Sequence, residues 1–128
     1  MLSRLAIEHI ALIDRLELDI PPGLVIITGE TGAGKSIVID SVNLVLGERA
    51  DKDLIQSGAE RAKVEALFDI DRKDVLKEME DRGVETEGGQ LILARELSTN
   101  GRNICRINGR MSSLSMLKEA SDLLVDVH

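Results

Sequence analysis

The chain has 128 residues, with 16 basic and 23 acidic side chains and a formal net charge of −7. This length is typical of one domain, which can bury roughly two-thirds of the surface that its unfolded chain exposes. The acidic balance excludes a compact nucleic-acid-binding module whose whole surface is basic, but it leaves room for a local basic strip. Phe68 is the only aromatic residue, so an aromatic platform for stacking bases is excluded and the core must be aliphatic.

Cysteine content and hydropathy indicate the compartment. The single cysteine, Cys105, cannot form an internal disulfide and offers no metal cluster. Charged residues interrupt the N-terminal segment, and no stretch approaches the roughly 20 apolar residues that span a bilayer. We therefore expect a chain of the reducing cytoplasm in which Cys105 is a small core residue.

The N-terminal part predicts a β-hairpin followed by a buried strand. Residues 2–10 and 11–20 alternate between apolar and polar side chains, as half-buried strands do. Two prolines and a glycine at 21–23 predict a turn that ends the second strand. The unbroken aliphatic run at 24–27 is typical of a strand that is buried on both faces.

A helix is predicted over residues 35–46, because its apolar residues recur at spacings of three and four. Gly47 is suited to end that helix. The stretch 48–60 is polar and mixed, with room for one helical turn at 51–55.

The C-terminal half is predicted to contain, in order, strand 62–70, helix 73–82, strand 90–97, strand 102–108, helix 113–123 and strand 124–127. An Asn-Gly pair at 100–101 predicts the hairpin between the third and fourth of these elements. The acidic 71–87 region is most simply a solvated helix and loop. Because the chain stops at His128, just after the last strand begins, we expect it to be a fragment. The alternative is that this strand closes the sheet.

Residues 29–36 form a phosphate-binding motif. They match G-x-x-x-x-G-K-[ST] at every fixed position, and they are Gly29, Glu30, Thr31, Gly32, Ala33, Gly34, Lys35 and Ser36. The motif follows the buried-type strand and opens the predicted helix, which is the setting that it requires. Glycines let successive backbone N–H groups point at one anion, and the helix dipole adds partial positive charge at the same place.

The last two residues of the motif have separate roles. Lys35 can place its ammonium group against the β- and γ-phosphates, and the Ser36 hydroxyl can coordinate Mg²⁺, which prefers oxygen ligands. The sequence therefore predicts binding of a nucleoside triphosphate with Mg²⁺. The alternative is a glycine-rich turn with an incidental Lys-Ser pair.

Hydrolysis needs, in addition, an acidic residue near Mg²⁺ and a group that positions the attacking water. Asp126 follows an apolar run and is one candidate, for which the alternative is a strand-end carboxylate that faces solvent. Asp69 is a weaker candidate, because the residues before it alternate like a half-exposed strand. Neither aspartate is followed by glutamate, so we assign no catalytic residue within this chain.

Several segments resemble one known family. The similarity is carried by three stretches together: G-E-T-G-A-G-K-S at 29–36, L-G-E-R-A at 46–50 and I-N-G-R at 107–110. In them the chain is similar to the N-terminal head segment of a bacterial group of DNA-repair proteins. This group belongs to the structural-maintenance-of-chromosomes (SMC) ABC-type ATPases. The resemblance covers essentially the whole chain, and the other similar segments are 1–7, 26–28, 39–40, 57–62, 101–102 and 126–128.

The resemblance implies an α/β fold of the P-loop NTPase class. Residues 1–128 would be the N-terminal half of an ABC-type ATPase head, with a mixed sheet around the P-loop helix and an antiparallel β-lobe beside it. A long coiled coil would separate this half from a C-terminal half that carries the signature motif, the Walker B acids and the switch histidine. Asp126 would then belong to the strand before a magnesium-contacting glutamine and would not be the Walker B acid.

The resemblance also implies a function. ATP would join two heads into a dimer, hydrolysis would release them, and the cycle would regulate grip on broken DNA in recombinational repair at the bacterial nucleoid. The partners implied are the C-terminal half of the same head, a second head and DNA. The residues leave two rivals open. One is a self-contained small P-loop kinase, and the other is a non-enzymatic nucleotide-sensing interaction domain.

Three further positions carry over from the family with less force. Arg49 matches a loop arginine near nucleotide or DNA, with a surface arginine as the alternative. His9 ends the first strand, where related heads approach the base, and its alternative is an exposed strand-end histidine. Gln56 stands where a basic residue is expected, which weakens a DNA contact there.

A basic stretch without acids follows the Asn-Gly turn. In one continuous strand, Arg102, Arg106 and Arg110 share a face and Cys105 and Ile107 share the other. This stripe predicts contact with phosphates of DNA. The alternative is an ordinary solvated face.

Overall fold

The computed structural model describes residues 2–20 and 33–125. In this part of the chain six strands form one sheet that is antiparallel throughout, in the order β2-β1-β3-β4-β5-β6. The strands are β1 (Leu2–Ile10), β2 (Ile13–Asp19), β3 (Arg61–Asp69), β4 (Gln90–Ser98), β5 (Asn103–Ile107) and β6 (Arg110–Ser112). The helices are α1 (Ala33–Val45), α2 (Lys73–Asp81), α3 (Leu114–Val125) and a 3₁₀ turn, η1 (Lys52–Leu54).

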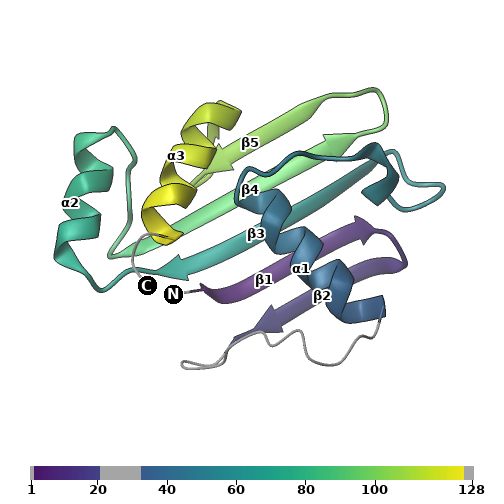
Figure 1. Ribbon diagram of the computed structural model, residues 1–128, viewed down its shortest axis with the longest axis horizontal. Coiled ribbons are helices and arrows are strands. Elements are labelled where there is room, and N and C mark those ends of the chain that lie inside the picture. Colours follow the sequence, from purple (N-terminus) through teal and green to yellow (C-terminus); the bar gives the residue numbers. More distant parts are fainter. Residues whose placement is uncertain (1, 21–32, 126–128) are drawn as a thin grey trace.

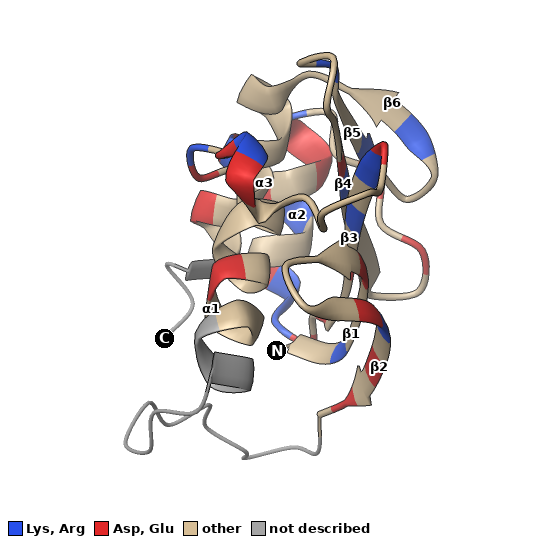
Figure 2. Cartoon of the chain, turned by 90° about the vertical axis from the view of Figure 1, so that its right-hand side faces the viewer, with Lys and Arg blue, Asp and Glu red and all other residues tan. Residues whose placement is uncertain are grey.

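All three α-helices lie on one face of the sheet (Figure 1). Seen from the side, they form one layer, and the opposite face of the sheet carries no described helix (Figure 2). Strand alternation explains this arrangement. In β3, for example, Ala62, Val64 and Ala66 are buried under α1, whereas Lys63 and Glu65 lie on the open face and form an ion pair at 3.8 Å. The core is therefore a single aliphatic layer between sheet and helices.

Most of the predicted elements are confirmed. The hairpin of β1 and β2, the strands β3 and β4, the helix α2 and the short turn η1 lie where the sequence places them. The antiparallel β-lobe that the family resemblance implies is this sheet. The predicted turn at 21–23 and buried strand at 24–27, which would make the sheet mixed, lie outside the described residues.

Near the C-terminus one prediction is wrong and one strand was not predicted. The strand predicted from residue 124 is still helix at 124–125, because α3 continues to place apolar residues at helical spacing, with Leu117 and Ala120 fully buried and Leu124 half-buried after them. The sequence analysis also missed β6. Asn108 and Gly109 both have positive φ, 50° and 81°, and form a two-residue turn that reverses the chain after β5.

Gly47 ends α1 as predicted, and its geometry is that of a Schellman motif. Glu48 N–H donates to the Asn43 carbonyl at 3.0 Å, and Gly47 N–H donates to the Leu44 carbonyl at 3.1 Å. Gly47 has a φ of +96°, and a Cβ placed on it would lie 3.1 Å from the Cβ of Lys118 in α3. Glycine is needed here both for its backbone conformation and for the close approach of α3.

No helix in the described ranges is long and apolar enough to cross a membrane.

We predict that Gly47→Ala lowers the free energy of unfolding more than Gly58→Ala does. Both positions have similar positive φ values, +96° and +89°, so each alanine should cost about 1–2 kcal/mol in backbone strain. Only Gly47 has a neighbour within contact distance of the added methyl group, since nothing lies within 4 Å at Gly58. Urea unfolding of the two variants measures the difference, and equal losses would contradict the packing role of Gly47.

Candidate nucleotide-binding site

Helix α1 begins inside the phosphate-binding motif. Its first turn contains Ala33, Gly34, Lys35 and Ser36, and it carries no acidic residue. The first four N–H groups of an α-helix have no partner within the helix, and they concentrate partial positive charge. The described part of the motif therefore suits an anion such as a phosphate chain. Gly29, Glu30, Thr31, Gly32 and the side chains of Lys35 and Ser36 lie outside the described residues.

The buried face of α1 fixes the helix on the sheet. Ser41, Leu44 and Val45 are buried, and α1 packs across β1, β3 and β4. The Ser41 hydroxyl donates to the Ile37 carbonyl at 2.8 Å, so this buried polar group is satisfied within the helix. Asp40 and Asn43 are exposed on the opposite side.

Arg95 in β4 holds the other end of α1. Its Nη1 donates to the carbonyls of Leu44 at 2.9 Å and Glu48 at 2.5 Å, and its Nε donates to Asn103 Oδ1 at 3.0 Å. The sequence analysis missed this residue. The signal was present, because Arg95 has the same strand parity as the buried residues Leu91, Leu93 and Leu97.

The turn between β1 and β2 is tied to the segment around η1. Ala11 N–H donates to the Leu54 carbonyl at 2.7 Å, and Gln56 N–H donates to the His9 carbonyl at 2.8 Å. The Gln56 side chain donates to Asp14 Oδ1 at 2.6 Å. Gln56, which departs from the basic residue expected in the family, thus acts as a tether between the two segments. The β1–β2 turn and the segment around η1 lie at the end of the sheet from which α1 starts (Figure 1).

The structure does not bring His9 and Arg49 together. His9 is exposed, has a φ of +54°, and lines a shallow surface with residues 56–61. Arg49 is also exposed, but it lines a different hollow with Asp40 and Asn43, beside the middle and C-terminal half of α1. The two side chains therefore lie on separate surfaces of this chain, and the structure gives no support for contact of both with one nucleotide.

The predicted arginine stripe is wrong as a single face. Arg102 precedes β5, Arg106 lies in β5, and the turn at 108–109 places Arg110 on β6 opposite Ile107. Residues that face each other across an antiparallel pair share a side of the sheet, so Arg110 and Arg106 point to opposite sides.

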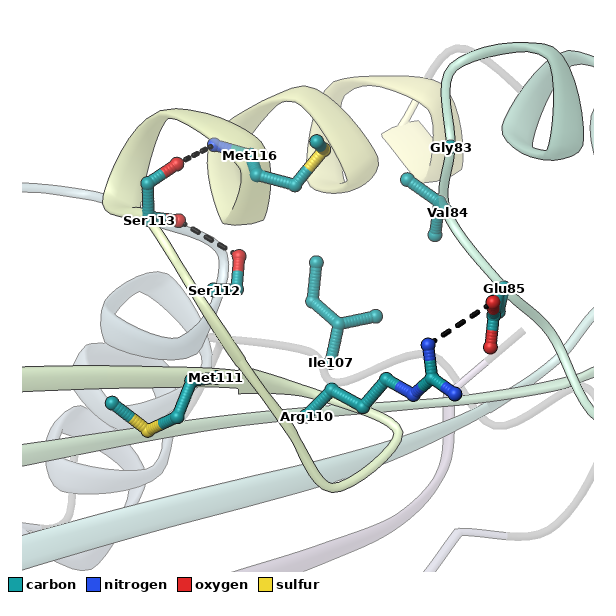
Figure 3. Close-up of a pocket in the computed structure, with 9 residues that line it drawn as sticks. All are labelled: Gly83, Val84, Glu85, Ile107, Arg110, Met111, Ser112, Ser113 and Met116. Carbon is teal, nitrogen blue, oxygen red and sulfur yellow. Dashed lines mark hydrogen bonds and ion pairs between the residues drawn. The ribbon is translucent and has the colours of Figure 1, made fainter.

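Acidic partners further separate these arginines. Arg106 lies 3.8 Å from Glu96, which also pairs with Arg61 at 3.1 Å. Arg110 pairs with Glu85 at 3.1 Å at the rim of a small hollow (Figure 3). That hollow has a volume of about 260 Å³, below the roughly 300–1,000 Å³ of ordinary ligand pockets.

Neither candidate acid gains support. Asp69 ends β3 at the end of the sheet opposite to the start of α1, and it accepts a hydrogen bond from Gln90 at 3.3 Å (Figure 1). Asp126 lies outside the described residues. Within the described ranges, no group of three or more His, Cys, Asp or Glu side chains is arranged to hold a metal ion. Cys105 is buried in the core as predicted, and burial raises the pKa of its thiol.

Comparison with known proteins identifies the family. A family model described as an AAA domain matches residues 4–121. The chain belongs to this family. Across its whole length this AAA domain is 40% identical to the DNA repair protein RecN of Halalkalibacterium halodurans and 36% identical to RecN of Bacillus subtilis. It spans only 23% and 22% of those two proteins, respectively.

A solved structure supports the fold assignment. It comes from work on the ATP-driven dimerization and DNA-stimulated activation of SMC ATPases, and it matches with a TM-score of 0.75 and 22% identity. The match covers 97% of this AAA domain and 79% of the solved chain. The resemblance drawn from the motif segments is thereby confirmed, both for the RecN-like sequence and for the head fold.

Proposed function

We propose that the chain is the ATP-binding half of a RecN-like ATPase that acts in the recombinational repair of DNA double-strand breaks. The observation that carries the proposal is the start of α1 inside a complete phosphate-binding motif, with no acidic residue in its first turn. Whole-length similarity to two RecN proteins supports the assignment to repair.

The motif residues divide the work of binding. The backbone N–H groups of residues 29–36 and the ammonium group of Lys35 would hold the phosphates, and the Ser36 hydroxyl would hold Mg²⁺. Bound Mg²⁺ would neutralise part of the phosphate charge. The tethered turn at His9 and the loop at Arg49 are the flanking segments that we propose for further contacts with nucleotide or DNA.

The proposed partners follow from the relatives. Because the chain spans about a quarter of the RecN proteins that it matches, we propose that a C-terminal half completes the head across a coiled coil. A second head would join on ATP binding, as the work on SMC ATPases describes for its own proteins. The whole protein would act on DNA at the nucleoid in the bacterial cytoplasm.

DNA contact by the three arginines is the weakest part of this proposal. Arg106 remains a candidate on the open face of the sheet, and Arg102 remains one in the exposed turn before β5, whereas Arg110 points to the other side. The ion pair of Arg106 with Glu96 reduces the positive charge that it could offer to a phosphate.

The Lys35→Ala substitution tests the proposal. Lys35 supplies the main charge-assisted contact to the phosphates, and such contacts are worth roughly 1.5–3 kcal/mol, so the affinity for Mg-ATP should fall about tenfold or more. Calorimetric titration of the wild type and the variant measures this effect. Lys77→Ala is the matched control, because Lys77 is exposed on α2, which lies at the end of the fold opposite to the start of α1 (Figure 1). Equal affinity in the wild type and Lys35→Ala would contradict the proposal.

Turnover separates the proposal from its two rivals. We expect the 128-residue chain alone to hydrolyse Mg-ATP negligibly, because phosphoryl transfer depends on positioned charges that we place in the C-terminal half and the second head. Adding the C-terminal half of the parent protein should restore phosphate release.

The contrary outcomes identify the rivals. Robust release that depends on Lys35 from the chain alone would overturn the split-head proposal. Transfer of phosphate to an added small-molecule acceptor would favour the kinase. Nucleotide binding without any turnover in the full-length protein would favour the sensing domain.

A further inference from the structure

Arg95 is the one charged side chain in the described ranges that is buried, with 1% of its surface exposed. It lies in the middle of β4, directly opposite Val64 on one side and Cys105 on the other. Burial lowers the pKa of its guanidinium, although arginine side chains keep their charge in proteins. A buried cation is costly unless its donors are satisfied, so the acceptors around Arg95 indicate why the charge is kept.

The acceptors are backbone carbonyls and an amide. Among the described residues, Arg95 has no carboxylate partner within ion-pair distance. Its Nη1 is shared by the carbonyls of Leu44 and Glu48, and its Nε donates to Asn103 Oδ1. Leu44 and Glu48 belong to the last turn of α1 and to the Schellman motif that ends it. The guanidinium thus faces the negative end of the helix dipole, which compensates part of its charge.

A second contact holds the same end of α1. Gly47 lies against Lys118 of α3, close enough that a Cβ on Gly47 would be 3.1 Å from the Lys118 Cβ. The end of α1 is therefore held by β4 and by α3. A helix of 13 residues is a rod of about 20 Å that translates and tilts as a unit. The hold on its C-terminal carbonyls sets the position of the helix along its axis, and packing on β1, β3 and β4 restricts its tilt, so together they determine where the N-terminal N–H groups lie.

We propose that Arg95 is a positioning residue for nucleotide binding, which holds α1 from its C-terminal end so that its first turn lies correctly for the phosphates. This inference rests on the proposed function. Arg95 itself touches no nucleotide. It acts through α1, and by holding the Glu48 carbonyl it also fixes the backbone just before Arg49.

The chemistry of the site requires arginine. The planar guanidinium can donate to acceptors on separate elements at once, whereas a lysine ammonium has no Nε donor for Asn103 and lacks the fork geometry. Methionine keeps much of the apolar stem but leaves the carbonyls of Leu44 and Glu48 without this donor. We therefore expect an order of effects, with Arg95→Met stronger than Arg95→Lys.

The test uses the full-length parent protein and the non-hydrolysable analogue AMP-PNP with Mg²⁺. Calorimetry is performed well below the unfolding midpoint of every variant, so that only folded protein is compared. We expect Arg95→Met to bind about tenfold more weakly, as the loss of charge-assisted hydrogen bonds implies, and Arg95→Lys to lie between it and the wild type. Arg4→Met is the matched control, because it removes an exposed arginine of the same sheet whose side chain pairs with Glu17 of β2.

Amide hydrogen exchange distinguishes a positioning role from a purely structural one, because a purely structural role would not change the effect of nucleotide binding on exchange. In the wild type, binding of the analogue at the start of α1 should slow amide exchange at residues 44–48, and in Arg95→Met this slowing should be lost. Wild-type affinity in Arg95→Met and Arg95→Lys, or no slowing at 44–48 in the wild type, would overturn the inference. Where Arg95→Met does not fold, Arg95→Lys and Asn103→Ala decide in its place, with about threefold weaker binding expected from the partial loss of these hydrogen bonds.

The failure of this inference is distinguishable from the failure of the proposed function. If Lys35→Ala weakens binding as predicted while the Arg95 variants bind normally, only the positioning role is wrong. If the wild type does not bind the analogue, or Lys35→Ala binds as well as the wild type, the proposed function itself is wrong.

Discussion

The described structure fixes helix α1 on the sheet by two sets of contacts, one along its apolar face and one at its C-terminal end. Its apolar face, with Leu44 and Val45, packs on the buried side of the sheet. The carbonyls at its C-terminal end accept hydrogen bonds from the backbone N–H groups of Gly47 and Glu48. Arg95 of β4 donates further hydrogen bonds there. The N-terminal N–H groups are the ones that an α-helix itself leaves without partners. A helix held in this way offers a positively polarised end at a defined place.

Much of this fold could be predicted from the sequence because its strands are half-buried. A sheet that is covered on one face imposes alternation, which is strict in β3 and holds in β4 except at Ala94. Prediction failed where segments are short. The three residues of β6 are too few for a pattern, although Asn108-Gly109 before them was a usable turn signal. The apolar run at 123–125 fits a strand or a helix equally well, and only the packing of α3 decides between them.

The parts of the candidate site that depend on the residue types and spacing of a motif could be predicted from the sequence. The parts that depend on tertiary geometry could not. The residue pattern at 29–36 is enough to predict a phosphate site. The grouping of Arg102, Arg106 and Arg110 failed because a single two-residue turn changes the face of every residue after it. Arg95 could have been found, since alternation places it on the buried face of β4, but its acceptors on α1 are distant in the sequence by 47 and 51 residues.

The most direct test of the account is a structure of the full-length protein with Mg²⁺ and a non-hydrolysable ATP analogue. The account predicts that the β-phosphate lies within hydrogen-bonding distance of backbone N–H groups in the first turn of α1 and of the Lys35 ammonium group, while Arg95 still holds the carbonyls of Leu44 and Glu48. A nucleotide bound elsewhere in the chain, with the first turn of α1 facing no phosphate, would contradict it.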